Sequence, residues 1–83
     1  MELPAMSPED QDRKLVYMAN QIATFFNTAA DDEAVASIEA HIRKFWDPRM
    51  RAKIIAFRAH GGTGLTESAA AAVDRLSREV ARA

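Results

Sequence analysis

The chain has 83 residues, a mass of 9.2 kDa, 28% charged side chains and a formal net charge of −1. This length suits one small domain and excludes both a second independent domain and a large enclosed active site. Of the residues counted as hydrophobic, 17 are alanine and only 23 are bulky. A chain this short buries only about 60–65% of the surface of its unfolded form, so we expect a partner to contribute to its stability.

Cysteine is absent, which excludes disulfides, zinc–thiolate sites, iron–sulfur ligation and thiol nucleophiles. The first eight residues contain no basic start followed by an apolar run, and the longest purely apolar stretch is residues 69–73. We therefore expect neither a signal peptide nor a membrane span, and we expect a cytoplasmic protein.

The charges are distributed unevenly along the chain. Residues 1–40 carry eight acidic and two basic side chains, residues 41–60 carry one acidic and six basic, and residues 61–83 carry three of each. A basic middle segment therefore follows an acidic start.

The first predicted helix covers about residues 8–28, after a loose end at residues 1–6. Ser7 is a candidate N-cap with Pro8 in the first helical position, and acidic residues follow in the first turn. Bulky apolar residues then recur at helical spacing, which predicts the inward face. They are Leu15, Met18, Ile22, Phe25 and Phe26.

A second helix is predicted at about residues 32–46, with Val35, Ile38, Ile42 and Phe45 on its inward face. Asp47 and Pro48 end it, because a residue that precedes proline disfavours the helical conformation. Asp47 then caps a third helix whose first residue is Pro48.

The third predicted helix, about residues 48–60, is apolar on two sides. Met50, Ile54 and Phe57 form one side, and Ile55 lies with Ala52 and Ala59 on the other. This pattern predicts that the helix packs against two partners. His60 is expected to complement the C-terminal end of this helix.

Three glycines, Gly61, Gly62 and Gly64, predict a turn, because glycine readily adopts positive φ and ends helices. Thr66 is a candidate cap for a fourth helix at about residues 67–82, whose inward face is expected to hold Ala69, Val73, Leu76 and Val80. No alternation typical of strands is present. The sequence therefore predicts one all-α domain over residues 1–83, a small bundle of three to four short helices.

The basic segment at residues 41–51 (HIRKFWDPRMR) allows three interpretations: a surface that docks an acidic or carbonyl-lined partner, a solvated face, or a nucleic-acid contact. The net charge of −1 does not favour nucleic acid. Trp46 lies at the edge of the predicted inward face. It suits both a half-exposed position at an interface and a buried position that completes the core.

The glycine turn does not match a phosphate-binding motif, because no strand precedes it and no Gly-Lys-Ser/Thr follows. His41 and His60 are 19 positions apart without a carboxylate at ligand spacing, so neither metal binding nor catalysis is expected.

The basic segment, together with MANQIA at residues 18–23, GGTGL at 61–65 and AVDRL at 72–76, resembles the delta subunit of NAD-dependent formate dehydrogenase. The resemblance covers about residues 14–76, and the basic segment is its most specific part. The family consists of small accessory subunits of soluble, cytoplasmic molybdenum or tungsten enzymes. These enzymes oxidise formate to carbon dioxide and pass the electrons through flavin and iron–sulfur clusters to NAD.

The resemblance implies that the chain is not an enzyme and carries no cofactor itself. Bis-molybdopterin guanine dinucleotide, iron–sulfur clusters and FMN are expected in the partner subunits. The chain would dock on the catalytic alpha subunit, and would support complex assembly and the insertion or retention of the pterin cofactor. The alternative is a small helical nucleic-acid-binding or regulatory module that uses the third helix for recognition.

No catalytic or metal-binding residue is expected. The residues expected to bind the partner are Arg43, Phe45, Trp46, Arg49, Arg51 and Ile55, of which Arg49 and Arg51 could contact cofactor phosphates transiently. The residues expected to form the turns are Asp47, Pro48, Gly61, Gly62 and Gly64.

Overall fold

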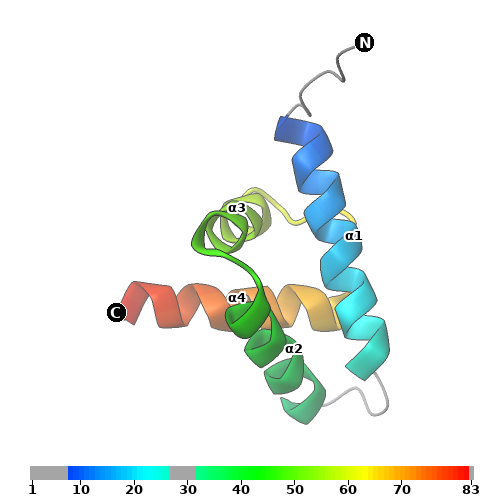
Figure 1. Ribbon diagram of the computed structural model, residues 1–83, viewed down its shortest axis with the longest axis vertical. Helices are drawn as coiled ribbons and strands as arrows, with labels where there is room; N and C mark the ends of the chain where they lie inside the picture. The colour runs from blue at the N-terminus through cyan, green and yellow to red at the C-terminus, as the bar shows by residue number, and fades with distance from the viewer. Residues whose placement is uncertain (1–7, 27–31, 83) are drawn as a thin grey trace.

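A computed structural model describes residues 8–26 and 32–82 and shows four helices (Figure 1). They are α1 (Pro8–Phe26), α2 (Asp32–Phe45), α3 (Pro48–Ala59) and α4 (Glu67–Arg82). No strand occurs in these two ranges, so the all-α prediction is confirmed. The proposed cap Ser7, the loose end and the break between the first two helices lie outside the described residues.

Helices α1 and α4 hold the bundle together, because each packs against all three other helices. Figure 1 shows α4 crossing the molecule, with α3 beside the first half of α1 and α2 beside its second half. Helix α3 contacts both α1 and α4, which confirms the prediction of two packing partners. Its far side is less buried than predicted, since Ala52 and Ala59 are exposed.

The corner between α2 and α3 forms as the sequence predicts. Asp47 is the N-cap of α3, and its side chain accepts a hydrogen bond of 2.9 Å from the backbone N–H of Met50. Arg51 then reaches back, and its Nη1 donates to the carbonyl oxygens of Arg43 and Trp46, each at 2.9 Å. These carbonyls lie at the end of α2, where no further helical N–H can reach them. The corner thus caps both helices.

The predicted glycine turn is confirmed, because Gly61, Gly62 and Gly64 have φ values of 120°, 65° and 95°. At Gly62 a Cβ atom would lie 2.8 Å from Cδ of Arg58, so both the conformation and the space favour glycine. His60 precedes the turn as the C-cap of α3, and its Nδ1 lies 2.8 Å from the carbonyl oxygen of Ala56.

Asn20 of α1 ties the segment between α3 and α4 to the bundle. Its Nδ2 donates to the carbonyl oxygen of Gly64, and its Oδ1 accepts from the backbone N–H of Thr66, both at 2.9 Å. Thr66 in turn accepts a bond of 3.3 Å from the N–H of Ala69 through Oγ1, which confirms its predicted role as the cap of α4.

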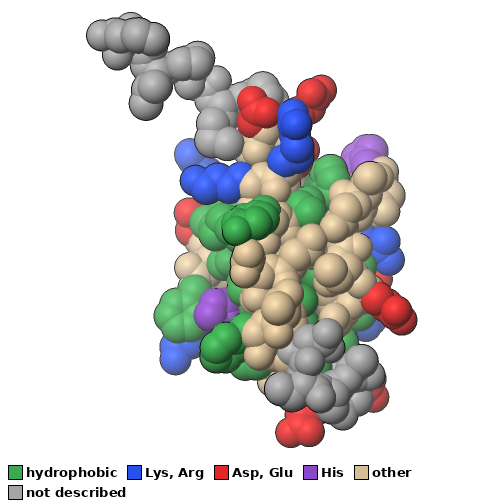
Figure 2. Space-filling view, turned by 90° about the vertical axis from the view of Figure 1, so that its right-hand side faces the viewer, with side chains coloured by type: hydrophobic (Ala, Val, Ile, Leu, Met, Phe, Trp, Pro, Cys, Tyr) green, Lys and Arg blue, Asp and Glu red, His purple; other side chains and the backbone are tan. Residues whose placement is uncertain are grey.

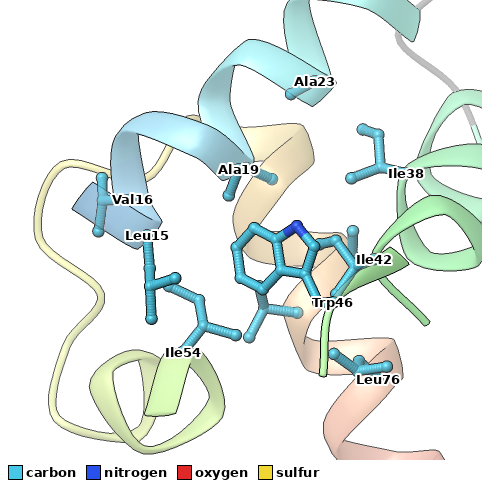
Figure 3. Packing of buried hydrophobic residues seen from close by; sticks show 12 residues of the cluster. Leu15, Val16, Ala19, Ala23, Ile38, Ile42, Trp46, Ile54 and Leu76 are labelled. Carbon is cyan, nitrogen blue, oxygen red and sulfur yellow. The ribbon is translucent and has the colours of Figure 1, made fainter. Parts of the chain in front are cut away.

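The core lies where the four helices meet, and Trp46 is at its centre with 4% of its surface exposed. Figure 3 shows the indole ring among side chains of α1, α2, α3 and α4. The other members of the cluster are Leu15, Val16, Ala19, Ala23, Ile38, Ile42, Ile54, Ala69, Ala72, Val73 and Leu76.

Two phenylalanines predicted to face inward are instead exposed, Phe25 at 77% and Phe45 at 65%. In α1 the buried face turns toward Ala19 and Ala23, whose small side chains allow neighbouring helices to approach closely. Phe25 consequently lies outside the face along which α1 packs against the other helices. At the end of α2, Trp46 fills the core position and leaves Phe45 at the surface. The side chain of Val80 lies outside the described residues.

Candidate functional site

The six residues predicted to bind a partner do not form one surface. Of the two positions predicted for Trp46, the buried one is confirmed, so its indole is not available for docking. Ile55 is half-buried against the core, and Arg51 is engaged with the end of α2. Only Phe45 and Arg49 are exposed without an anchoring role in the described structure.

Arg43 takes part in an ionic network between α2 and α4. It forms ion pairs with Glu39, one turn earlier, and with Oε2 of Glu79 at 2.8 Å. Nε of Arg75 lies 3.2 Å from the other carboxylate oxygen of Glu39. Glu39 is 3% exposed, so the two arginines neutralise a carboxylate that would be costly to bury alone. The positive charge of Arg43 therefore contributes to the stability of the fold.

A second ion pair joins α3 to α4. Nε and Nη2 of Arg58 donate to the two carboxylate oxygens of Asp74 at 3.0 and 3.2 Å, a planar two-point contact. The hydrogen bond to Asp74 and the charge of that carboxylate raise the pKa of Arg58 above its ordinary value. Arg58 therefore links α3 to α4 and is not a free basic group.

Four aromatic rings form a surface where the end of α1 meets α2; we call Phe25, Phe26, His41 and Phe45 the aromatic patch. Phe26 lies with its centroid 5.1 Å from that of Phe25 and 6.1 Å from that of His41, and His41 lies 4.7 Å from Phe45. Nζ of Lys44 lies 5.5 Å from the Phe45 centroid. Figure 2 shows hydrophobic side chains on both sides of a histidine on this face.

A groove of about 350 Å³ separates the first half of α1 from the start of α3. We call it the α1/α3 groove. Its lining residues are Gln11, Lys14, Leu15, Met18, Asp47, Arg49, Met50 and Lys53. Arg49 is thus the one predicted partner-binding residue that reaches this groove. Lys53 also forms an ion pair of 3.3 Å with Asp12.

The described residues contain no group of three or more His, Asp or Glu side chains placed to hold a metal ion. His41 stacks in the aromatic patch, and His60 caps α3. No helix in residues 8–26 and 32–82 combines the length and the apolar character needed to cross a membrane.

Sequence reasoning missed Phe25 and Lys14 as surface residues of interest, because both lie on α1, outside the basic segment. Phe25 was assigned to the core by its helical spacing. Ala19 and Ala23 could have corrected this assignment. They follow Leu15 at intervals of four residues and therefore lie on the same face of the helix as Leu15.

Comparison with known proteins identifies a family model that matches residues 14–73, that of the NADH-dependent formate dehydrogenase delta subunit FdsD. The match runs from the first half of α1 into α4 and includes the corner, the glycine turn and most residues of both candidate surfaces. No curated protein and no solved structure matches the chain. The comparisons give no support to a nucleic-acid-binding role.

Proposed function

The chain belongs to the NADH-dependent formate dehydrogenase delta subunit family, and from this premise we propose that it is a non-catalytic accessory subunit that docks on the catalytic alpha subunit. In this role it supports assembly of the complex and the insertion or retention of bis-molybdopterin guanine dinucleotide in that subunit. The family description itself makes the chain one subunit of a formate dehydrogenase.

The observation that carries the docking proposal is the aromatic patch. Phe25 and Phe45 are 77% and 65% exposed. Burying them would stabilise a small domain that has few bulky apolar residues. Exposed aromatic clusters with adjacent cations are typical of interfaces, where they supply most of the binding free energy. The patch takes the docking role first assigned to Trp46.

The α1/α3 groove does not fit a resident pterin cofactor. Its volume, about 350 Å³, lies at the small end of the range for drug-sized ligands, and a bis-dinucleotide is far larger. A role in assembly is therefore better supported than permanent cofactor binding. Transient contact with phosphates would fall to Arg49, because Arg51 already donates to two carbonyls.

The docking proposal is tested by co-expressing the tagged chain with the other subunits of the complex. We expect the double variant Phe25→Ser, Phe45→Ser to fold normally by circular dichroism but to lose co-purification with the catalytic subunit. The matched control is Tyr17→Ser, which removes another aromatic side chain of α1, 64% exposed, from outside the patch. Equal co-purification of the double variant and the wild type would refute the patch as the docking surface.

The assembly role has a separate measurement. Complex produced without the chain, or with the double variant, should contain less molybdenum or tungsten per catalytic subunit, and its formate oxidation should fall in the same proportion. Full metal content in the absence of the chain would exclude a role in cofactor insertion or retention.

A further inference from the structure

The α1/α3 groove is distinct from the aromatic patch. Lys14 and Phe25 are eleven positions apart on α1, which places them roughly 16 Å apart along the helix axis. In Figure 1 the first half of α1 lies beside α3, whereas α2 lies beside its second half. A partner that covers the aromatic patch would therefore need a different set of its own side chains to fill the groove.

We propose that the α1/α3 groove binds an acidic segment of the partner subunit, with an apolar side chain on its floor and carboxylates on Lys14 and Arg49. This inference rests on the proposed docking function and adds to it a second contact of defined chemistry.

The floor of the groove is apolar. Leu15 is 6% exposed and belongs to the core, whereas Met18 and Met50 are half-buried and pack against it. Methionine side chains are flexible and polarisable, so they adapt to the shape of an inserted side chain. A volume of about 350 Å³ suits a few side chains of a peptide.

The rim is basic. Three cations, Lys14, Arg49 and Lys53, face a single carboxylate, that of Asp47. Lys53 is already paired with Asp12, and Asp47 accepts the N–H of Met50.

Lys14 and Arg49 are both exposed, and within residues 8–26 and 32–82 neither forms an ion pair. They lie near the start of α3, whose dipole adds positive potential. A carboxylate-bearing segment complements this rim, whereas a basic segment would be repelled.

The combination of floor and rim favours an acidic peptide over nucleic acid. Phosphates would use the cations but leave the apolar floor without a partner, and the chain has no net positive charge. A peptide with one bulky apolar residue between carboxylates satisfies both parts of the groove.

The first test measures the affinity of the purified chain for the purified catalytic subunit. We expect Arg49→Glu to weaken binding about tenfold or more, and to reduce the dependence of affinity on salt concentration. The matched control is Arg78→Glu, an equal change of charge at an exposed position on α4 outside the groove. Equal affinities for the two variants would overturn the inference. Absence of binding by the wild type would instead overturn the docking proposal itself.

The second test identifies the occupant directly. The chain has no cysteine, so a Gln11→Cys variant can be labelled at one position with a benzophenone maleimide, beside the groove. Irradiation of the assembled complex and mass spectrometry should give a crosslink to a segment of the catalytic subunit with two or more carboxylates. A crosslink to a neutral or basic segment, to a second copy of the chain or to the chain's own first residues would contradict the inference. Displacement of the catalytic subunit by a DNA or RNA oligonucleotide would also contradict it.

Discussion

Trp46 is the only tryptophan, and its burial makes it a direct reporter of the fold. We expect its fluorescence in the free chain to be blue-shifted relative to the unfolded chain and poorly quenched by acrylamide. Trp46→Ala should lower the free energy of unfolding by about 3–5 kcal/mol, because it removes the largest side chain from the centre of the core. Urea denaturation measures this loss. Red-shifted, easily quenched emission from the native chain would show that the indole is exposed.

Glu39 provides a second test at the scale of single residues. Glu39→Gln should lower the free energy of unfolding by about 1–3 kcal/mol, because the buried end of the network with Arg43 and Arg75 loses its charge. Glu79→Gln is the matched control, since Glu79 binds the same Arg43 but its side chain is 53% exposed. We expect the control to cost less than about 1 kcal/mol. If urea denaturation showed that Glu79→Gln lowers the free energy of unfolding more than Glu39→Gln does, this description of the network would be contradicted.

At the scale of elements, the segment between α3 and α4 depends on one side chain of another helix. Asn20→Ala should lower the free energy of unfolding by about 1–3 kcal/mol, because two hydrogen bonds are lost, those to Gly64 and Thr66. Hydrogen exchange of the Thr66 amide should accelerate in this variant. Asn20→Asp keeps the acceptor for Thr66 and loses only the donor to Gly64, so it should preserve more of that protection. Similar exchange rates at Thr66 in wild type and Asn20→Ala would disprove the link.

The corner between α2 and α3 shows how closely local signals can specify an element boundary. Asp47 and Pro48 predicted both the end of one helix and the start of the next, and the structure confirms both. The cap, the fixed φ of proline and the restriction on the residue before it act over neighbouring positions only. Arg51 adds a contribution that local signals do not contain, since it bonds to carbonyls five and eight positions earlier.

At the scale of the whole molecule, the two candidate docking surfaces, the aromatic patch and the α1/α3 groove, lie on different parts of one bundle. A partner that covers them binds only the folded chain and therefore stabilises it. If the chain docks on the catalytic subunit as proposed, free catalytic subunit at about 100 times its Kd should raise the free energy of unfolding of the chain by about 2.7 kcal/mol. Val73 is fully buried, so we expect its amide to exchange only through global unfolding, and this exchange should slow about a hundredfold. Unchanged exchange at saturation would contradict docking on the folded chain.

The sequence by itself determined the bounds of the described helices, the corner and the glycine turn, because the caps and breaks that set them act between residues a few positions apart. Asp47, Pro48, Gly62 and Thr66 have the roles that their local chemistry predicts. The basic segment and its flanking motifs also carried the family resemblance, which the family match confirms.

Only the tertiary structure decided the positions of Trp46, Phe25 and Phe45 relative to the surface. Trp46 is buried in the core, and Phe25 is exposed because α1 packs along the face that carries Ala19 and Ala23; both positions depend on contacts with helices distant in sequence. The same packing pairs Arg43 with Glu79 and leaves Arg49 beside Lys14 at a groove. The positions of these charges follow from contacts between α1, α2, α3 and α4, which no local pattern of residues encodes.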